Sequence, residues 1–151
     1  MLDDLDRLIL RALQDEPTLG LPDLAERVRA TVSRVSRRVE KLRELGVLRK
    51  VRALVDWRAI GYEVEVSLRF TLDKTHRNAF DEFIQAARKV PEVIEIQTFL
   101  GKVDVRLNVI ARDIGHYRWL YRERILTLPH ISDIEALMHV ATVKEQDRLP
   151  I

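Results

Sequence analysis

The chain has 151 residues, of which 46% are hydrophobic and 33% are charged, and it contains no cysteine. This composition is typical of a folded protein with one domain or two small ones, and it excludes a disulfide scaffold and any cysteine-based zinc site or nucleophile. No apolar run is long enough to span a bilayer, and the start MLDDLDRL is acidic where a signal peptide is basic, so we expect a cytoplasmic protein.

The net charge of +2 conceals an uneven distribution along the chain. Residues 1–26 contain seven acidic and two basic residues, a net charge of −5. Residues 27–52 contain ten basic and two acidic residues, a net charge of +8. A basic block this short indicates a localised anionic partner, although a solvated face without a partner has the same composition.

The basic block lies within a region that shows three helical patterns. The first has its apolar residues at helical spacing, at Leu5, Leu8, Ile9, Ala12 and Leu13. Asp3 or Asp4 is suited to cap this helix, and the second, shorter helix is expected to start at Pro22, a residue suited to the first helical position. The third has Thr31 as its N-cap, ends at Gly46, and has an apolar stripe of Val32, Val35, Val39, Leu42 and Leu45.

The hydrophobic period changes after Gly46. Residues 47–57 are β-prone, and residues 62–70 alternate between apolar and polar side chains, as in a half-buried strand. A helix carrying Phe80, Phe83, Ala87 and Val90 follows, and then strands at 93–100 and 103–111, a helix capped by Asp113, and a strand at 131–143. The order β-α-β-β-α-β predicts a ferredoxin-like domain.

These patterns together predict an α+β chain with two domains. We expect a helix-turn-helix domain at 1–48, a β connector or hinge at 49–61, a ferredoxin-like domain at 62–144, and a loosely ordered tail at 145–151.

The third helix carries a basic face in addition to its apolar stripe. Arg34, Arg37, Arg38 and Lys41 stand at i, i+3, i+4 and i+7, so they share one face. Small hydroxyl residues flank the N-terminal end of this face, at Thr31, Ser33 and Ser36. Since helix-turn-helix proteins place the N-terminal half of this helix in the major groove, the pattern predicts binding to double-stranded DNA.

The order of several segments resembles the Lrp/AsnC ("feast/famine") family of prokaryotic transcription regulators. The matching segments are LDDLDRLILRALQDEP, PDLAERV, SRRVEKLRELGVL, RALVDWRAIG, LGKVDVRLNVIARD, LPHISDIEALMHVATVK and RLPI. The resemblance implies a winged helix-turn-helix, a β connector and a RAM-type sensor domain that forms dimers, and often tetramers or octamers. It also implies a small-molecule effector, commonly an amino acid, bound between protomers near the turn that joins the second and third sensor strands.

Two departures from the family pattern concern function. Arg29 stands where the family usually has a glycine between the motif helices, so the turn either differs or accepts a strained arginine that adds a phosphate contact. In the sensor, the family's Gly-Asp is Gly101-Lys102 here, and the expected effector positions are Leu100, Gly101, Lys102, Asp104, Glu135 and Ala136. The effector therefore differs and presents a carboxylate to Lys102, or none is used, or Lys102 is simply a turn lysine.

The polar strand positions predict an interface. One face of the expected sheet carries Glu63, Glu65, Arg69, Gln97, Arg106 and Asn108, flanked by Phe99 and Ile110. In dimers of the family this face packs on its symmetry mate, so we expect an isologous homodimer and a pseudo-palindromic operator.

The remaining residues offer no competing chemistry of comparable strength. His76, His116, His130 and His139 are dispersed, and we expect no metal, no cofactor and no catalytic residue. Two alternatives stay open: an enzyme related to sirohaem decarboxylases, which share the architecture, and an architectural DNA-binding protein that works without an effector.

Overall fold

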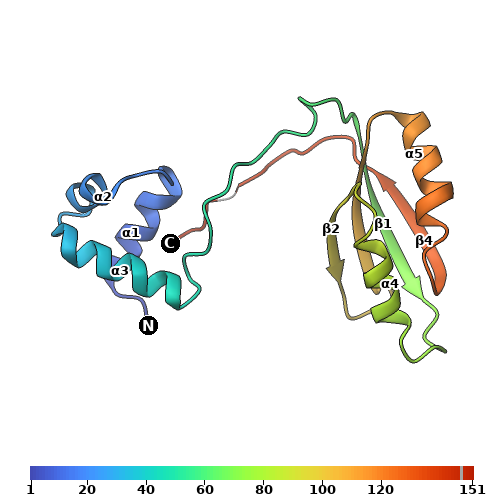
Figure 1. Cartoon of the computed structure of the whole chain (residues 1–151), viewed down its shortest axis with the longest axis horizontal. Helices are drawn as coiled ribbons and strands as arrows, with labels where there is room; N and C mark the ends of the chain where they lie inside the picture. The colour runs from blue at the N-terminus through green and yellow to red at the C-terminus, as the bar shows by residue number, and fades with distance from the viewer. Residues whose placement is uncertain (147) are drawn as a thin grey trace. The chain divides into compact units, whose positions relative to one another are not determined.

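The computed structural model describes residues 1–146 and 148–151 and divides into two compact units (Figure 1). The first unit combines Met1–Leu54 with Thr142–Ile151, and the second spans Val55–Ala141. Each unit has a hydrophobic core of its own. In the described part of the chain, no helix is long and apolar enough to cross a membrane.

The first unit is built on three helices, α1 (Asp4–Asp15), α2 (Leu21–Arg27) and α3 (Val32–Glu44). Asp3 caps α1, because its carboxylate accepts a hydrogen bond from the Asp6 N–H at 2.9 Å and the Asp6 carboxylate accepts one from the Asp3 N–H at 3.1 Å. Thr31 caps α3, with its Oγ1 accepting from the Arg34 N–H at 3.3 Å. Pro22 lies in the first turn of α2. The predicted caps of α1 and α3 are confirmed, and α2 begins one residue before the predicted start at Pro22.

The core of the first unit joins the apolar sides of the three helices. Its most deeply buried side chains are Ile9, Leu24, Val35 and Leu42. Val32 and Leu45 were predicted to belong to the buried stripe of α3, and this is wrong, because both side chains are exposed. They lie at the two ends of the helix, where the apolar period continues beyond the neighbouring helices that could cover it.

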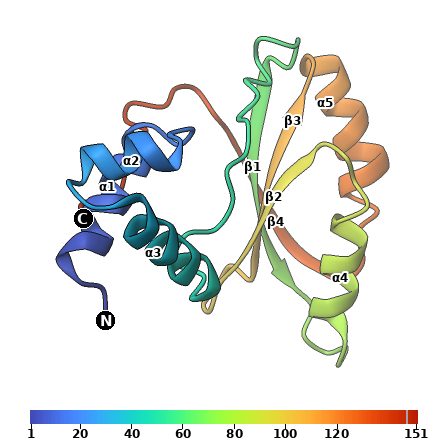
Figure 2. The same ribbon diagram turned by 60° about the vertical axis from the view of Figure 1, so that its left-hand side comes forward.

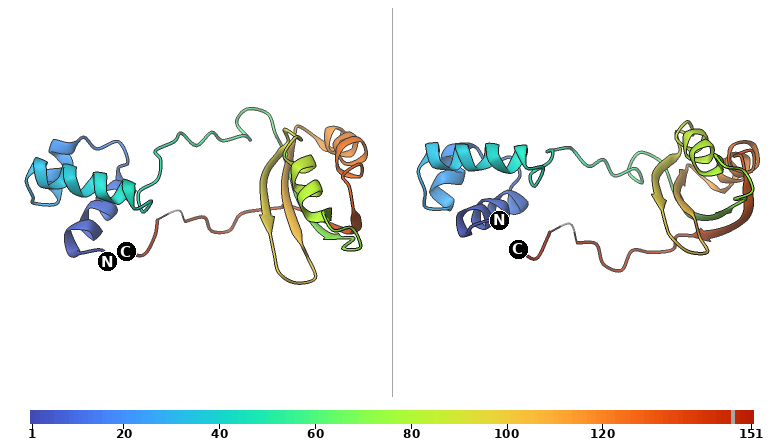
Figure 3. Two further views of the ribbon diagram at one scale, coloured as in Figure 1. Left: turned by 60° about the horizontal axis from the view of Figure 1, so that its bottom comes forward. Right: turned by 90° about the horizontal axis from the view of Figure 1, so that it is seen from below.

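The second unit is a four-stranded antiparallel sheet with helices on one face (Figures 2 and 3). Along the chain its elements are β1 (Val64–Leu72), α4 (Ala79–Ala87), β2 (Val93–Thr98), β3 (Val105–Ala111), α5 (Ile114–Leu120), the π-helical turn η1 (Tyr121–Ile125) and β4 (Ile131–Met138). The strands lie in the order β2-β3-β1-β4. The predicted ferredoxin-like order is confirmed.

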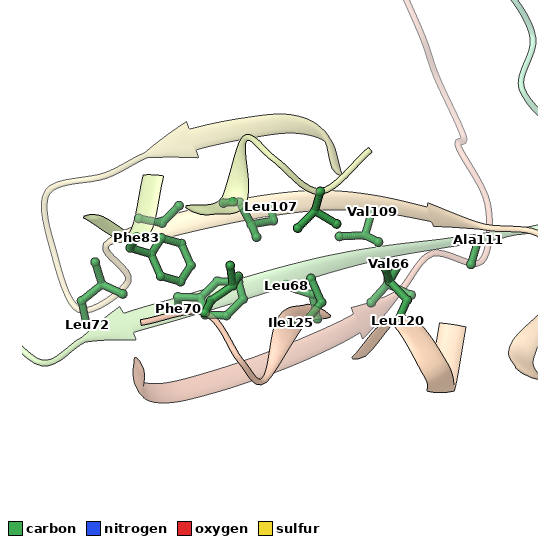
Figure 4. Close-up of a cluster of buried hydrophobic side chains, with 14 of the residues drawn as sticks. Val66, Leu68, Phe70, Leu72, Phe83, Leu107, Val109, Ala111, Leu120 and Ile125 are labelled. Carbon is green, nitrogen blue, oxygen red and sulfur yellow. The ribbon is translucent and has the colours of Figure 1, made fainter. Parts of the chain in front are cut away.

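The core of the second unit lies between the sheet and its helices (Figure 4). Alternate β1 residues point into it, and the Phe70 ring contacts that of Phe83 from α4 at a centroid distance of 4.8 Å. Phe80, which the sequence places with Phe83 on the same expected helix, is 43% exposed. Helix α4 instead buries Phe83 and Ala87, which stand four residues apart and so share one face.

The connector and the last residues of the chain differ from expectation. Residues 49–63 contain turns and no strand, so the predicted β connector is absent from the single chain. Residues 148–151 were expected to be loosely ordered, and this is wrong for them, because they are hydrogen-bonded to α1. Short segments without hydrophobic periodicity give no sequence signal for such a long-range contact.

Candidate nucleic-acid interface and effector site

Helix α3 presents a polar, basic surface because its apolar stripe is buried. Val35, Val39 and Leu42 pack into the core of the first unit. The outward positions are exposed at Ser33, Arg34, Arg37 and Lys41, and half-buried at Ser36. The α3 residues that the sequence predicts to bind DNA, apart from Arg38, therefore lie on one surface of the helix, close to the Thr31 cap.

Arg38 departs from the rest of the predicted basic face. Its guanidinium lies 2.6 Å from Asp3 and 3.5 Å from Asp6, and Asp6 is only 3% exposed. The hydrogen bond from the Asp6 N–H holds the pKa of Asp3 below its ordinary value, and the Arg38 charge lowers it further. Arg38 thus joins α3 to the first turn of α1. Within the described residues no ion pair involves Arg34, Arg37 or Lys41.

The turn before α3 contains a strained arginine. Arg29 has φ +53°, in the left-handed region that favours glycine. The Ala30 N–H donates to the Ala25 carbonyl at 3.0 Å and the Arg29 N–H to the Glu26 carbonyl at 3.1 Å. This pair of bonds is a Schellman motif, which ends α2. The chain therefore keeps the turn expected with glycine and places an exposed arginine in it.

Residues 99–104, which join β2 to β3, hold most of the expected effector positions. Leu100 and Lys102 are exposed, and Gly101 has φ +149°. The Lys102 carbonyl accepts a hydrogen bond from Thr71 Oγ1 at 2.8 Å, which joins the loop to β1. The Lys102 side chain extends from the surface of this loop.

Asp104 is buried, and its carboxylate has partners within the chain. It accepts a hydrogen bond from the Leu72 N–H at 2.8 Å and lies 3.0 Å from Lys74 Nζ. Burial raises the pKa of Asp104, but the Leu72 N–H and the Lys74 ammonium outweigh it, so the pKa lies below its ordinary value. These contacts give Asp104 a structural role at the end of β1.

Glu135 and Ala136 lie on β4, at the opposite edge of the sheet from β2. Glu135 is opposite Arg69 in the strand register, with a side-chain distance of 3.9 Å, and Ala136 is opposite Leu68. Because neighbouring residues of a strand point to opposite faces, Glu135 and Ala136 face different sides of the sheet. A single chain does not bring all six expected effector positions into one site.

The face of the sheet without helices carries a row of charged and polar side chains. Gln97 is opposite Arg106, Arg106 is opposite Arg69, and Arg69 is opposite Glu135. A cavity of about 340 Å³ on this face is lined by Arg69, Gln97, Phe99, Val103 and Arg106. Arg106 is paired with Glu95 at 3.0 Å.

Two histidines described as dispersed in the sequence are neighbours in space. The rings of His76 and His130 have a centroid distance of 4.6 Å, and His130 Nε2 lies 2.5 Å from Glu82. No group of three metal-ligating side chains with suitable geometry occurs among the residues that the structure describes.

Comparison with known families assigns both units. Residues 65–149 match the Lrp/AsnC ligand binding domain, and residues 2–49 match a winged helix-turn-helix DNA-binding domain. The chain belongs to the Lrp/AsnC family. Among its Lrp/AsnC relatives, the HTH-type transcriptional regulator Zrp of Zymomonas mobilis is 32% identical, over 99% of this chain and 97% of Zrp. The transcriptional regulator AzlB of Bacillus subtilis is 28% identical, over 100% of this chain and 96% of AzlB.

Solved Lrp/AsnC structures share the fold over nearly the whole chain. An AsnC family transcriptional regulator from Agrobacterium tumefaciens is 32% identical with a TM-score of 0.86, covering 99% of this chain and 97% of that one. The regulator NMB0573 of Neisseria meningitidis, solved as a complex with L-Met, is 25% identical with a TM-score of 0.89 and the same coverage. Zrp, AzlB and the Agrobacterium protein are all named as transcriptional regulators, which supports the prediction that this Lrp/AsnC protein is not an enzyme.

The position of Arg38 predicts a stability effect that its neighbour does not share. Arg38→Ala removes the cationic partner of the buried Asp6 carboxylate and leaves it only the Asp3 N–H, so we expect the free energy of unfolding to fall by on the order of 1–2 kcal/mol. Arg37→Ala, at an exposed position, is expected to change it by less than about 0.5 kcal/mol. Urea unfolding curves of the two variants measure the difference. Equal stabilities would show that Arg38 does not support the unit.

The strained turn predicts opposite effects on stability and DNA affinity. Arg29→Gly relieves the left-handed conformation, so we expect a gain of up to about 1 kcal/mol in unfolding free energy. The same change removes a cation. The slope of the logarithm of DNA affinity against the logarithm of salt concentration should therefore become shallower by about the value of one phosphate contact. Arg29→Ala is the matched control, because it loses the charge and keeps the strain. The strain argument fails if the glycine and alanine variants are equally stable.

Proposed function

We propose that this Lrp/AsnC-family transcriptional regulator reads its operator with the exposed N-terminal half of α3. The observation that carries the proposal is that Arg34, Arg37 and Lys41 are exposed while their neighbour Arg38 is used within the fold. The winged helix-turn-helix match covers these residues and supports the same assignment. The basic surface is therefore not required for folding and is available to DNA.

The positions on α3 divide by the chemistry they offer. Arginine can bond the O6 and N7 atoms of guanine with its two-pronged guanidinium, so Arg34 and Arg37 are assigned to base edges. Thr31, Ser33, Ser36 and Lys41 are assigned to phosphates, which fix the helix in the groove. Arg29 adds a phosphate contact from the turn, whereas Arg38 acts by holding α3 in place.

The proposed domain bounds are those expected from the sequence. Residues 1–48 bind DNA, 49–61 connect the units, and 62–144 sense the effector and form the assembly. The open sheet face, with its row of arginine and glutamate side chains, is assigned to an isologous homodimer interface. Two copies of α3 then require a pseudo-palindromic operator, and tetramers or octamers extend the same assembly. The protein acts in the cytoplasm, where its DNA is.

The effector proposed for the sensor is an amino acid or a related carboxylate. The Neisseria relative was solved with L-Met, which supports this ligand class. Lys102 is exposed on the loop between β2 and β3, and its ammonium is suited to bind a carboxylate. Asp104 keeps its role in the loop, because its carboxylate is already bonded to Leu72 and Lys74. An effector-independent architectural role is the alternative.

Substitutions on α3 test the DNA proposal. We expect Arg34→Ala and Arg37→Ala each to weaken operator binding by about 1–3 kcal/mol and to relax specificity at one position. Lys41→Ala should weaken all sequences alike and lower the salt slope by about 1. Binding isotherms at several salt concentrations measure both effects, with Arg7→Ala, an exposed arginine on α1, as control. Full operator affinity in all three α3 variants would refute the assignment.

A thermal-shift screen tests the effector proposal. A carboxylate ligand at 100 times its dissociation constant stabilises the bound protein by about 2.7 kcal/mol. This stabilisation raises the melting midpoint. We expect the rise in the native chain and its loss in the Lys102→Asp variant. Lys89→Asp makes the same charge change at an exposed position on another part of the second unit and should keep the response. Absence of any shift in all three proteins, across amino acids and carboxylates, would favour the effector-independent alternative.

A further inference from the structure

Residues 148–151 lie against one side of α1, although more than 130 positions separate the two segments in sequence. The Leu149 N–H donates to Gln14 Oε1 at 2.6 Å, and Gln14 Nε2 donates to the Leu149 carbonyl at 3.5 Å. One amide side chain therefore binds both main-chain groups of one residue. This is the two-point contact by which an extended peptide is held in register.

Two charged residues of α1 add contacts on either side of Gln14. Arg148 lies 3.1 Å from Asp15, and Arg11 Nε donates to the main-chain oxygen of Ile151. Positions 11, 14 and 15 follow i, i+3, i+4 spacing, so all three side chains project from the same face of α1. The three contacts follow residues 148 to 151 along the helix.

Apolar side chains complete the contact. Ile151 is half-buried and packs on the core of the first unit. A cavity of about 320 Å³ beside it is lined by Leu2, Leu10, Leu13, Gln14, Val47, Leu48, Leu149 and Ile151. The apolar surface that Ile151 covers would face water if residues 148–151 detached.

We propose that this face of α1 is a docking groove for residues 148–151 of the same chain, and that the docked segment fastens the last sensor strand to the DNA-binding unit. Strand β4 ends at Met138, and the chain rejoins the first unit from Thr142. The chain thus passes between the units twice, once through the connector and once through this segment. The first turn of α1 in turn holds α3 through Arg38.

The consequence for regulation rests on the proposed function. The docked segment follows β4 of the sensor along the chain, and α1 supports the proposed DNA-reading helix. Release of the segment therefore loosens the support of α3 and lowers operator affinity. The groove is an intramolecular peptide-binding site whose occupant is the chain's own residues 148–151.

Amide hydrogen exchange on the full chain without DNA tests the docking. Leu149→Asp, Ile151→Asp and Gln14→Ala should each speed exchange of the α1 amides by about tenfold or more, because local opening sets the exchange rate. Exchange in β1 and β3 should stay the same. Glu145→Ala, at an exposed residue close to the docked segment, is the control and should leave α1 unchanged. Unchanged α1 exchange in all three variants overturns the docking.

Crosslinking identifies the chain that fills the groove. The chain has no cysteine, so Val47→Cys with Leu149→Cys introduces a single pair at two exposed residues that line the same cavity, leaves the Gln14 amide in place, and can be bridged by a short bis-maleimide. A crosslinked monomer on a denaturing gel supports the proposal. A crosslinked dimer means that the segment of a second copy occupies the groove, and it overturns the intramolecular form. Val47→Cys with Glu145→Cys controls for proximity alone.

Operator binding by the exchange variants separates the two parts of the proposal. We expect Leu149→Asp and Ile151→Asp to lose operator affinity by about tenfold, while Glu145→Ala keeps it. Faster α1 exchange with unchanged operator affinity overturns the coupling to DNA binding. A native chain that binds no DNA would instead refute the proposed function, and the exchange data would still decide whether the segment is docked.

Discussion

The contact of Arg38 with Asp3 and Asp6 sets the orientation of the helix on which the proposed DNA surface stands. A buried carboxylate without a partner is unfavourable, so Asp6 requires a cation close to α1. Arg38 meets this requirement from the middle of α3, and the Asp3 cap shares the same guanidinium. The Arg38 side chain therefore pairs with both carboxylates at the start of α1 and fixes α3 against that helix.

The uneven charge along the sequence is explained by such pairs. The acidic residues of the first 26 positions are used largely within the first unit: Asp3 and Asp6 with Arg38, Glu16 with Arg27, and Asp15 with Arg148. Most of these pairs are exposed and add little stability singly. Their larger effect is on the distribution of charge, because they leave the arginines of the outer α3 surface uncompensated. That surface can then release counterions from DNA.

Most of the fold could be predicted from the sequence because its signals are local. The caps at Asp3 and Thr31 and the alternation along β1 depend on neighbouring residues alone. The roles of Arg38 and of residues 148–151 could not be predicted in this way. Periodicity places Arg38 on a helix face, but its partner lies 32 positions away, and the docked segment has no period at all. The Arg29 conformation was one of two open alternatives, since sequence alone does not reveal whether strain is relieved or retained.

The sensor presents a constraint that one chain cannot meet. Neighbouring residues of β4 point to opposite faces, so Glu135 and Ala136 lie on different sides of a single sheet. Asp104 is held by Leu72 and Lys74 and offers no free carboxylate. A ligand that contacts Lys102, Glu135 and Ala136 together, as the proposed function requires, therefore needs a second copy to supply one of the two β4 residues. Under the proposed function, effector binding and assembly are linked, because the ligand stabilises the contact between copies that creates its own site.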